Sequence, residues 1–210
     1  MTCLCLTRNR RNWLPKAIDC FLAQTYPRRE LLIVADGEDV ADLVPQDERI
    51  RLLHVTGQTE IGEKRNFGCE HAYGDLIAHW DDDDFSAPGR LADQVGRLRE
   101  SGKAVTGYHS MRFTDGARWW QYINNPGFSL GTALLYRREW WASNRFPNKH
   151  IGEDNDFGGR AQQQGQMISV DAGDLMYATV HPGNTSPRPL SGTNWKEIEC
   201  NHTAARLSAV

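Results

Sequence analysis

The sequence contains no long apolar run and no paired-cysteine motif, and we expect no signal peptide. Nowhere do about 18 apolar residues follow one another, so no stretch has the length of a membrane-spanning helix. Residues 1–7 are too short for a signal peptide. The cysteines show no C-x-x-C spacing and are odd in number, which indicates free thiols in a reducing compartment; they are Cys3, Cys5, Cys20, Cys69 and Cys200. We therefore expect a soluble, cytoplasmic protein.

The sequence also has no strong excess of positive or negative charge. The formal net charge is −3, which gives no basic footprint for nonspecific nucleic-acid binding and favours a small-molecule partner. The chain also contains no Gly-rich phosphate loop, internal repeat or low-complexity segment. With 210 residues and 40% hydrophobic content it can bury one good core, so we expect a single domain over residues 1–210, with two tightly joined halves as the alternative.

Hydrophobic patterning predicts strands that alternate with helices in the first half. Apolar runs indicate strands at residues 2–7, 31–35, 50–55 and 76–80. A helix capped by Asn12 carries Pro15 in its first turn and ends before Pro27, and a second helix covers about residues 63–72. This alternation is typical of parallel connections in a doubly wound α/β sheet.

The second half has a different pattern of predicted elements. We expect a helix over 88–101 and a strand near 104–108, followed by short antiparallel strands and loops in the aromatic-rich residues 109–137. The remaining predicted elements are helices at 138–143 and 153–164, a strand at 175–180 and a final helix from Trp195.

Four consecutive carboxylates, Asp81 to Asp84, follow the predicted strand 76–80. Such groups repel one another, and a fold that holds them together offsets the repulsion with a cation or with hydrogen-bond donors. Oxygen ligands at the carboxyl end of a strand suit Mg²⁺ or Mn²⁺. The alternative is a solvated acidic loop. Asp36 ends the strand 31–35 at the same edge, although Asp36-Gly37 is also an ordinary turn signal.

Six motifs in order resemble the family-2 glycosyltransferases of the GT-A fold over residues 2 to about 165. They are Thr7 to Arg10, Gln24 to Pro27, Glu30 to Gly37, Gly62 to Gly68, Gly74 to Leu91 and Gly152 to Asp156. The resemblance implies a mixed, mostly parallel sheet flanked by helices, with a small antiparallel region on the acceptor side. It also implies a nucleotide-sugar-binding half over about 1–103 and an acceptor-binding half over about 104–210. The implied reaction is hexosyl transfer from a nucleotide-diphosphate donor with inversion, assisted by Mn²⁺ or Mg²⁺.

The resemblance also assigns residues to the donor and to the metal. Thr7, Asp36, Arg65, Asp81 and Asp82 fall at donor-binding positions, where Asp36 reads the base or ribose and Asp81 reaches the ribose or the metal. The metal positions are Asp83, Asp84 and His181. A shift of one residue would exchange Asp83 with Asp84 as main ligand and leave Asp82 as a spacer. The family commonly has two aspartates where this chain has Ala35-Asp36, which leaves the base open, with UDP favoured.

Each of these assignments has a structural alternative. Asp84 or Ser86 could instead cap the helix that begins near Pro88. Arg65 could form a salt bridge on its own helix with Glu63 or Glu70. His181 could be a structural hydrogen-bonding residue rather than a ligand.

Asp154 matches the family's general base, and Glu153 orients the loop or the acceptor. The attacking hydroxyl must lose a proton, which a carboxylate within hydrogen-bond reach accepts. Asp154 could alternatively cap the helix that follows. Trp119, Trp120, Trp140 and Trp141 are candidates for stacking on an acceptor sugar, with one of the four expected in the site, although paired tryptophans are more often core residues.

The expected partners are a nucleotide-sugar donor and a hydroxyl acceptor. A glycan is the default acceptor, with a lipid-linked sugar, a protein or a modified nucleic-acid base left open. A loop at 182–192 could close over the donor. Two other functions compete with transfer: a metal-dependent sugar-nucleotide hydrolase or nucleotidyltransferase, and a noncatalytic nucleotide-sugar-binding module.

Overall fold

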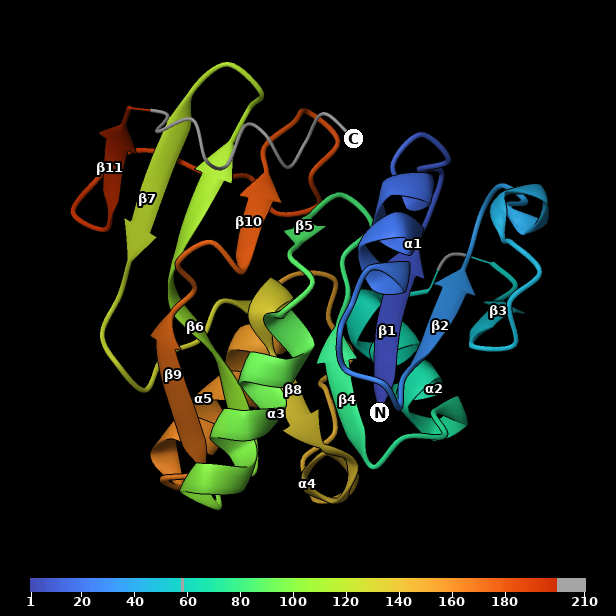
Figure 1. Cartoon of the computed structure of the whole chain (residues 1–210), viewed down its shortest axis with the longest axis horizontal. Coiled ribbons are helices and arrows are strands. Elements are labelled where there is room, and N and C mark those ends of the chain that lie inside the picture. Colours follow the sequence, from blue (N-terminus) through green and yellow to red (C-terminus); the bar gives the residue numbers. More distant parts are fainter. Residues whose placement is uncertain (58, 200–210) are drawn as a thin grey trace.

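The computed structural model describes residues 1–57 and 59–199 and shows one mixed sheet with helices on both faces (Figure 1). Four parallel strands form its first half in the order β3-β2-β1-β4. They are β1 (Thr2–Thr7), β2 (Glu30–Ala35), β3 (Ile50–His54) and β4 (Leu76–His79). The predicted α/β fold with parallel connections is confirmed for this half.

Helices cover both faces of the parallel strands (Figure 1). On one face, α1 and α3 pack on Cys3, Leu31 and neighbouring core residues, and on the other, α2 and α5 pack on Leu4 and Leu32. Successive residues of a strand point to opposite faces, so one apolar run supplies both cores. These helices are α1 (Leu14–Leu22), α2 (Ile61–His71), α3 (Arg90–Ser101) and α5 (Glu153–Gln163).

The second half extends the sheet with antiparallel neighbours. From β4 the order continues β8-β6-β7-β11, each pair antiparallel, and β9 and β10 run parallel to β6. The strands are β5 (Phe85–Ser86), β6 (Val105–Thr114), β7 (Trp119–Ile123), β8 (Leu135–Arg137), β9 (Met167–Asp171), β10 (Met176–Thr179) and β11 (Trp195–Ile198). Short helical segments complete the chain: η1 (Ala41–Leu43), η2 (Gly131–Ala133) and α4 (Arg138–Ser143).

Two local predictions are wrong. Trp195 begins the strand β11 rather than a helix, because Trp195–Ile198 pairs with β7, and this pairing overrides the helical propensity of Lys196 and Glu197. The part of that predicted helix beyond residue 199 lies outside the described residues. Asn12 does not cap α1, which is preceded by Trp13 and has no side-chain cap, although Pro15 does lie in its first turn.

Strand β9 was not predicted, yet it pairs parallel with the start of β6. The side chains of Met167 and Ser169 are buried, whereas Ile168 and Val170 are half-buried, so the strand buries one face only. The β-branched Ile168 and Val170 were the available signal.

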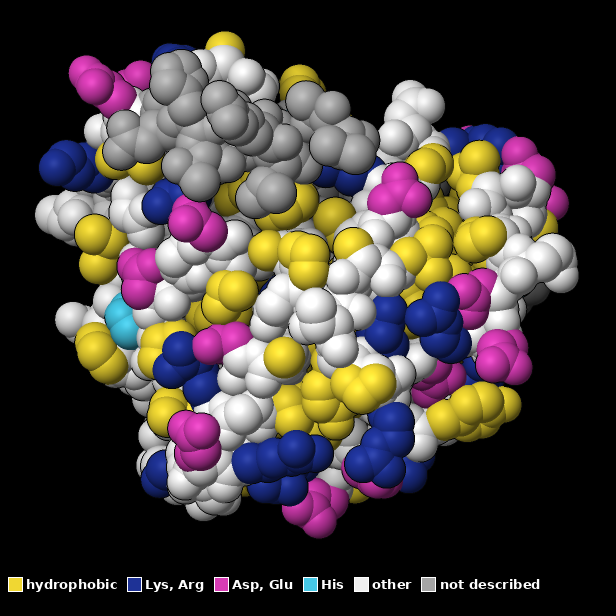
Figure 2. All heavy atoms as spheres, in the orientation of Figure 1, with side chains coloured by type: hydrophobic (Ala, Val, Ile, Leu, Met, Phe, Trp, Pro, Cys, Tyr) yellow, Lys and Arg dark blue, Asp and Glu magenta, His cyan; other side chains and the backbone are white. Residues whose placement is uncertain are grey.

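No helix among the described residues has the length and apolarity that membrane crossing requires. Cys3, Cys5, Cys20 and Cys69 are free, as predicted, and all four are buried, whereas Cys200 lies outside the described residues. On the face shown in Figure 2, acidic and basic side chains are interspersed, as the near-neutral composition predicts.

Candidate active site

A cavity of about 860 Å³ lies at the carboxyl ends of β1 and β4. Its walls come from the loop after β1, the start of α2, the acidic run, the segment 128–132, the start of α5 and the C-terminal loop. Ligands of open α/β sheets bind beyond the carboxyl ends of the strands. Of the predicted site residues, Thr7, Arg65, Asp81 to Asp84, Glu153 and Asp154 line the cavity. Asp36 and His181 are not among its lining residues.

Asp82 and Asp83 are buried beneath donors from the end of β1 and from the loop after it. The Thr7 hydroxyl donates to Asp82 Oδ2 at 2.7 Å. Arg10 Nη1 donates to Asp82 Oδ1 and to Asp83 Oδ2, both at 2.9 Å. Burial raises the pKa of Asp82 to about 6, against the opposing effect of Arg10. The alternative of a solvated acidic loop is therefore wrong, since only Asp81 of the four is partly exposed.

Asp84 is also buried and hydrogen-bonded. Its Oδ2 accepts a hydrogen bond from the Thr132 hydroxyl, and its Oδ1 accepts one from the Thr179 N–H at 3.0 Å. Burial, followed by the charges of Asp83 and Asp81, raises the pKa of Asp84 well above its usual range. Neither Asp84 nor Ser86 caps α3, which has no side-chain cap, so that alternative is wrong.

Asp81, Asp83 and Asp84 have the donor set of a divalent-cation site. One carboxylate oxygen from each lies within 4.8 Å of the others. No hydrogen-bond or ion-pair partner contacts the Asp81 side chain among residues 1–57 and 59–199. Three carboxylates so close together repel one another where they are shielded from water, and a cation bound between them would offset that repulsion. Hard oxygen ligands of this kind fit Mg²⁺ or Mn²⁺.

His181 contacts the acidic run from the C-terminal loop. Its Nε2 lies 3.0 Å from Asp83 Oδ2, and its ring stacks on Trp13 with centroids 4.5 Å apart. Asn184 Nδ2 donates to the same Asp83 oxygen at 3.2 Å. His181 therefore lies next to the three-carboxylate cluster, where it contacts one member directly.

Asp36 lies at the end of β2 and forms an ion pair with Lys64 of α2. Its Oδ2 is 3.8 Å from Arg8 Nη1 and has no hydrogen-bond partner among the described residues. Lys64 and Arg8 line the cavity, whereas Asp36 does not. The turn interpretation also holds, because Gly37 follows with a φ of 97°.

Arg65 and Glu153 form a buried ion pair that joins α2 to α5, with Arg65 Nε donating to Glu153 Oε1 at 3.0 Å. Burial alone would lower the pKa of Arg65, but the carboxylates of Glu153, Asp81 and Asp154 outweigh it and raise the pKa. Arg65 Nη1 has no hydrogen-bond partner in the described part of the chain. The predicted alternative, a salt bridge on the same helix, is wrong.

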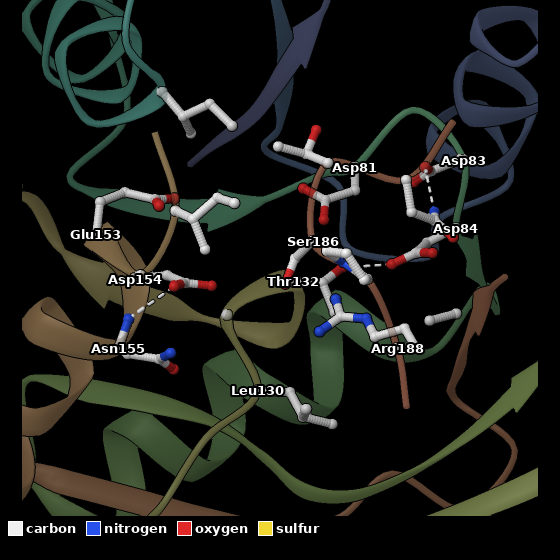
Figure 3. A pocket seen from close by; sticks show the side chains of 18 of the residues that line it. Asp81, Asp83, Asp84, Leu130, Thr132, Glu153, Asp154, Asn155, Ser186 and Arg188 are labelled. Carbon is white, nitrogen blue, oxygen red and sulfur yellow. Dashed lines mark hydrogen bonds between the residues drawn. The ribbon is translucent and has the colours of Figure 1, made fainter. Parts of the chain in front are cut away.

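Asp154 is the second residue of α5, which follows Gly152 at a φ of 83°. Its Oδ1 accepts the N–H of Asn155 at 2.7 Å. Its Oδ2 lies against Gly131, where a Cβ atom would be only 1.5 Å from that oxygen. Glycine at 131 therefore leaves the room that this carboxylate needs. Asp154 and Asp81 point into the same space, and Arg188 reaches into it from the C-terminal loop (Figure 3).

Several cavity residues were missed by the sequence analysis. Arg10 stood within the first motif, and Lys64 preceded Arg65, yet neither position reveals its partner more than 25 residues away. The aromatic lining was also misplaced. It comes from Tyr122, Phe128 and Trp195, and the four tryptophans considered above are not among the lining residues.

Comparisons with known proteins show the family of the chain. The model of Glycosyl transferase family 2 matches residues 3–161. An uncharacterized glycosyltransferase of Rickettsia felis is 30% identical over 171 residues, covering 70% of this chain and 27% of the relative. The putative teichuronic acid biosynthesis glycosyltransferase TuaG of Bacillus subtilis is 29% identical over 126 residues, covering 56% of this chain and 50% of TuaG. The chain thus spans half or less of the length of these relatives.

Solved structures show the same fold. S. aureus TarS in complex with UDP-GlcNAc aligns with a TM-score of 0.74 at 17% identity, covering 88% of this chain and 59% of that one. The mannosyltransferase PcManGT from Pyrobaculum calidifontis, in complex with GDP-Man and Mn²⁺, aligns with a TM-score of 0.67 at 17% identity, covering 85% and 56%. The fold is therefore that of the GT-A glycosyltransferases. Because the family model also covers most of the sequence, the chain belongs to glycosyl transferase family 2.

Proposed function

We propose that this glycosyltransferase moves a hexosyl group from a nucleotide-diphosphate donor to an acceptor hydroxyl with inversion, and that Asp154 is the general base. One observation carries the proposal: Asp154 and the carboxylates Asp81, Asp83 and Asp84 line one cavity from different elements. A base and a diphosphate site that share a cavity can hold the attacking hydroxyl and the donor in reacting geometry.

The donor binds, in this proposal, along β1, β2 and α2. Thr7, Asp36, Arg65, Asp81 and Asp82 are its binding residues. Arg65 Nη1 has no hydrogen-bond partner among residues 1–57 and 59–199, and we propose that it donates to an anionic oxygen of the donor. TarS binds UDP-GlcNAc and PcManGT binds GDP-Man, which supports a nucleotide-sugar donor here. We favour a UDP-sugar.

The diphosphate end of the donor lies at the acidic run. Asp83 and Asp84 would hold Mn²⁺ or Mg²⁺ together with Asp81, and His181 would support Asp83 or add a ligand. The Mn²⁺ of the PcManGT complex supports a divalent ion. When bound, the ion supplies positive charge that stabilises the leaving diphosphate more in the transition state than in the ground state.

Asp154 accepts the proton of the acceptor hydroxyl. Glu153 positions Asp154 through its ion pair with Arg65. Asp154 Oδ1 is held by the Asn155 N–H, which leaves Oδ2 facing the cavity. Figure 3 shows Asp154 across the open space from Asp83 and Asp84, which suits attack from the side opposite the leaving group. We also propose that residues 1–103 bind the donor and residues 104–210 bind the acceptor, a glycan by default.

Nucleoside diphosphate release from a panel of nucleotide sugars, with Mn²⁺ and with or without a glycan mixture, tests this function. Release that depends on acceptor, with a product of inverted anomeric configuration, is expected. Release that is independent of acceptor would instead assign the chain to sugar-nucleotide hydrolysis. Binding of a nucleotide sugar without any release would assign it to a noncatalytic module.

A further inference from the structure

We propose that Tyr122, Phe128 and Trp195 form an aromatic platform that binds a pyranose ring of the acceptor, which makes the acceptor a saccharide. The inference rests on the proposed function and names the substrate class of the same site. All three side chains line the cavity that contains Asp154.

The sheet register builds the platform. Trp195 of β11 lies directly opposite Tyr122 of β7 in the antiparallel pair, and their ring centroids are 4.9 Å apart at 62°. Phe128 follows at 6.4 Å from Tyr122. Phe113 of β6 is fully buried behind them, with its ring 4.8 Å from Trp195 and 6.3 Å from Tyr122. Edge-to-face packing of this kind fixes ring orientation, so the platform is held in place by the sheet.

The exposure of these rings sets them apart from neighbouring aromatic side chains on β6 and β7. Trp119 and Trp120 of β7 are 9% and 3% exposed, and Phe113 is 0% exposed. Tyr122, Phe128 and Trp195 are only half-buried. Large apolar rings that stay in contact with water in a concave site are typical of ligand-binding surfaces. A pyranose presents a face of C–H groups with partial positive charge, which is complementary to the negative face of an aromatic ring.

Polar groups surround the platform, as a hydroxyl-rich ligand requires. The Tyr122 hydroxyl accepts a hydrogen bond from Asn124 Nδ2 at 2.9 Å, which leaves its own proton to donate. Asn194 and Asn155 also line the cavity. Apolar walls with a few polar groups are the usual composition of a small-molecule subsite.

The position of the platform distinguishes it from a nucleobase site. The groups proposed to hold the nucleotide lie in or just after β1, β2 and β4 and in α2, whereas β7 and β11 lie at the opposite side of the sheet (Figure 1). The cavity wall contains the platform and, apart from Asp36, the nucleotide-binding groups. It also contains the acidic run, the segment 130–132 and Asp154. A saccharide seated on the platform would therefore approach Asp154 from the side away from the nucleotide.

The test measures saccharide and nucleotide binding separately. The wild-type chain, with UDP and Mn²⁺, is applied to an array of oligosaccharides, and UDP affinity is measured in parallel by calorimetry. Wild type should bind a subset of the array. Trp195→Ala and Tyr122→Ala should each lower the affinity for these oligosaccharides about tenfold, because a stacked ring is removed. The affinity for UDP should stay unchanged. Trp195→Phe should retain most of the affinity for oligosaccharides. Ile123→Ala, at an exposed neighbouring position outside the cavity lining, is the matched control.

Three results would overturn the platform: no oligosaccharide binds although UDP does, the two alanine variants bind oligosaccharides as wild type, or UDP affinity falls with oligosaccharide affinity. The last result would place the nucleobase on these rings. Far-UV circular dichroism reports whether each variant is folded. Trp195→Leu or Tyr122→Leu, which keeps apolar bulk without an aromatic face and should lose the same affinity, replaces an alanine variant that is not folded. If oligosaccharides bind at the platform and no nucleotide sugar is turned over, the proposed function fails and the platform stands.

Discussion

The two oxygens of Asp154 have different surroundings, and this difference suits a base. Oδ1 is fixed by the Asn155 N–H, whereas Oδ2 lies next to Gly131 and faces the cavity. A carboxylate that is anchored at one oxygen keeps its geometry while the other oxygen accepts a proton.

Asp154→Asn should abolish transfer and leave donor binding intact. An amide has a similar shape but does not accept the acceptor's proton, so kcat should fall by about 10²–10⁴-fold. Donor affinity, measured by calorimetry with the UDP-sugar, should stay within error. Asp156→Asn is the control, because that carboxylate is on the same turn but pairs with exposed Lys149. Turnover retained in Asp154→Asn would remove it as the base.

Gly131→Ala should reduce kcat by displacing the Asp154 carboxylate, since the added Cβ would lie 1.5 Å from Oδ2. A misplacement of about 1 Å in a catalytic group can cost about a hundredfold in rate. Gly159→Ala, in α5 with open space around it, is the control and should gain about 0.5–1 kcal/mol of stability with no loss of kcat. Equal kcat values in wild type and Gly131→Ala would show that the carboxylate does not depend on this glycine.

Between elements, the Arg65–Glu153 pair links α2 to α5 and predicts a dependence of stability on pH. Burial raises the pKa of Glu153, with Arg65 opposing. A carboxyl group with a raised pKa in the folded state stabilises the fold fully below its unfolded-state pKa, about 4.3. That contribution is lost as pH rises through the higher folded-state pKa, so the unfolding free energy should fall by at most about 1.4 kcal/mol per pH unit in this window.

Urea unfolding from pH 4 to 7 measures this dependence. Glu153→Gln should be less stable than wild type at pH 7, because Arg65 loses its buried partner, but its stability should fall less as pH rises. Exposed Glu139→Gln serves as the control and should follow wild type. Identical slopes for Glu153→Gln and wild type would contradict the linkage.

The C-terminal loop 182–192 is the element expected to change on donor binding. Arg10 Nη2 donates to the Gly183 carbonyl, and Arg188 reaches into the cavity (Figure 3). If this loop closes over the donor, cleavage within it by subtilisin should slow severalfold with UDP and Mn²⁺, as cleavage tracks the open population. Equal cleavage rates with and without the ligands would show that the loop is not a lid.

For the whole molecule, we expect metal-dependent stabilisation by the nucleotide. A ligand present at 100 times its Kd stabilises the folded state by about 2.7 kcal/mol, which raises Tm by about 5–11 °C in a chain of this size. Differential scanning fluorimetry with UDP should show this shift with Mn²⁺ and a much smaller one with a chelator. Asp83→Ala should lose the Mn²⁺-dependent part. A Tm that is the same with Mn²⁺ and with chelator would argue against the cation site.

Much of the fold and of the site could be predicted because strands and their ends follow from local sequence patterns. Strand ends in a parallel sheet lie at one edge, so Asp36 and the run from Asp81 were expected near each other. Arg65 and Glu153 are 88 residues apart, and their ion pair follows from packing of α2 against α5, which no local pattern encodes. The same holds for Trp195, whose place opposite Tyr122 depends on cross-strand register rather than on propensity.

The hydrogen bonds that hold the acidic run have a consequence for binding entropy. Asp82, Asp83 and Asp84 are already fixed by Thr7, Arg10 and Thr132. Immobilising a flexible side chain at binding costs about 0.5–1.5 kcal/mol. Here that ordering takes place during folding, so a ligand meets a preorganised surface and loses little affinity to rearranging it.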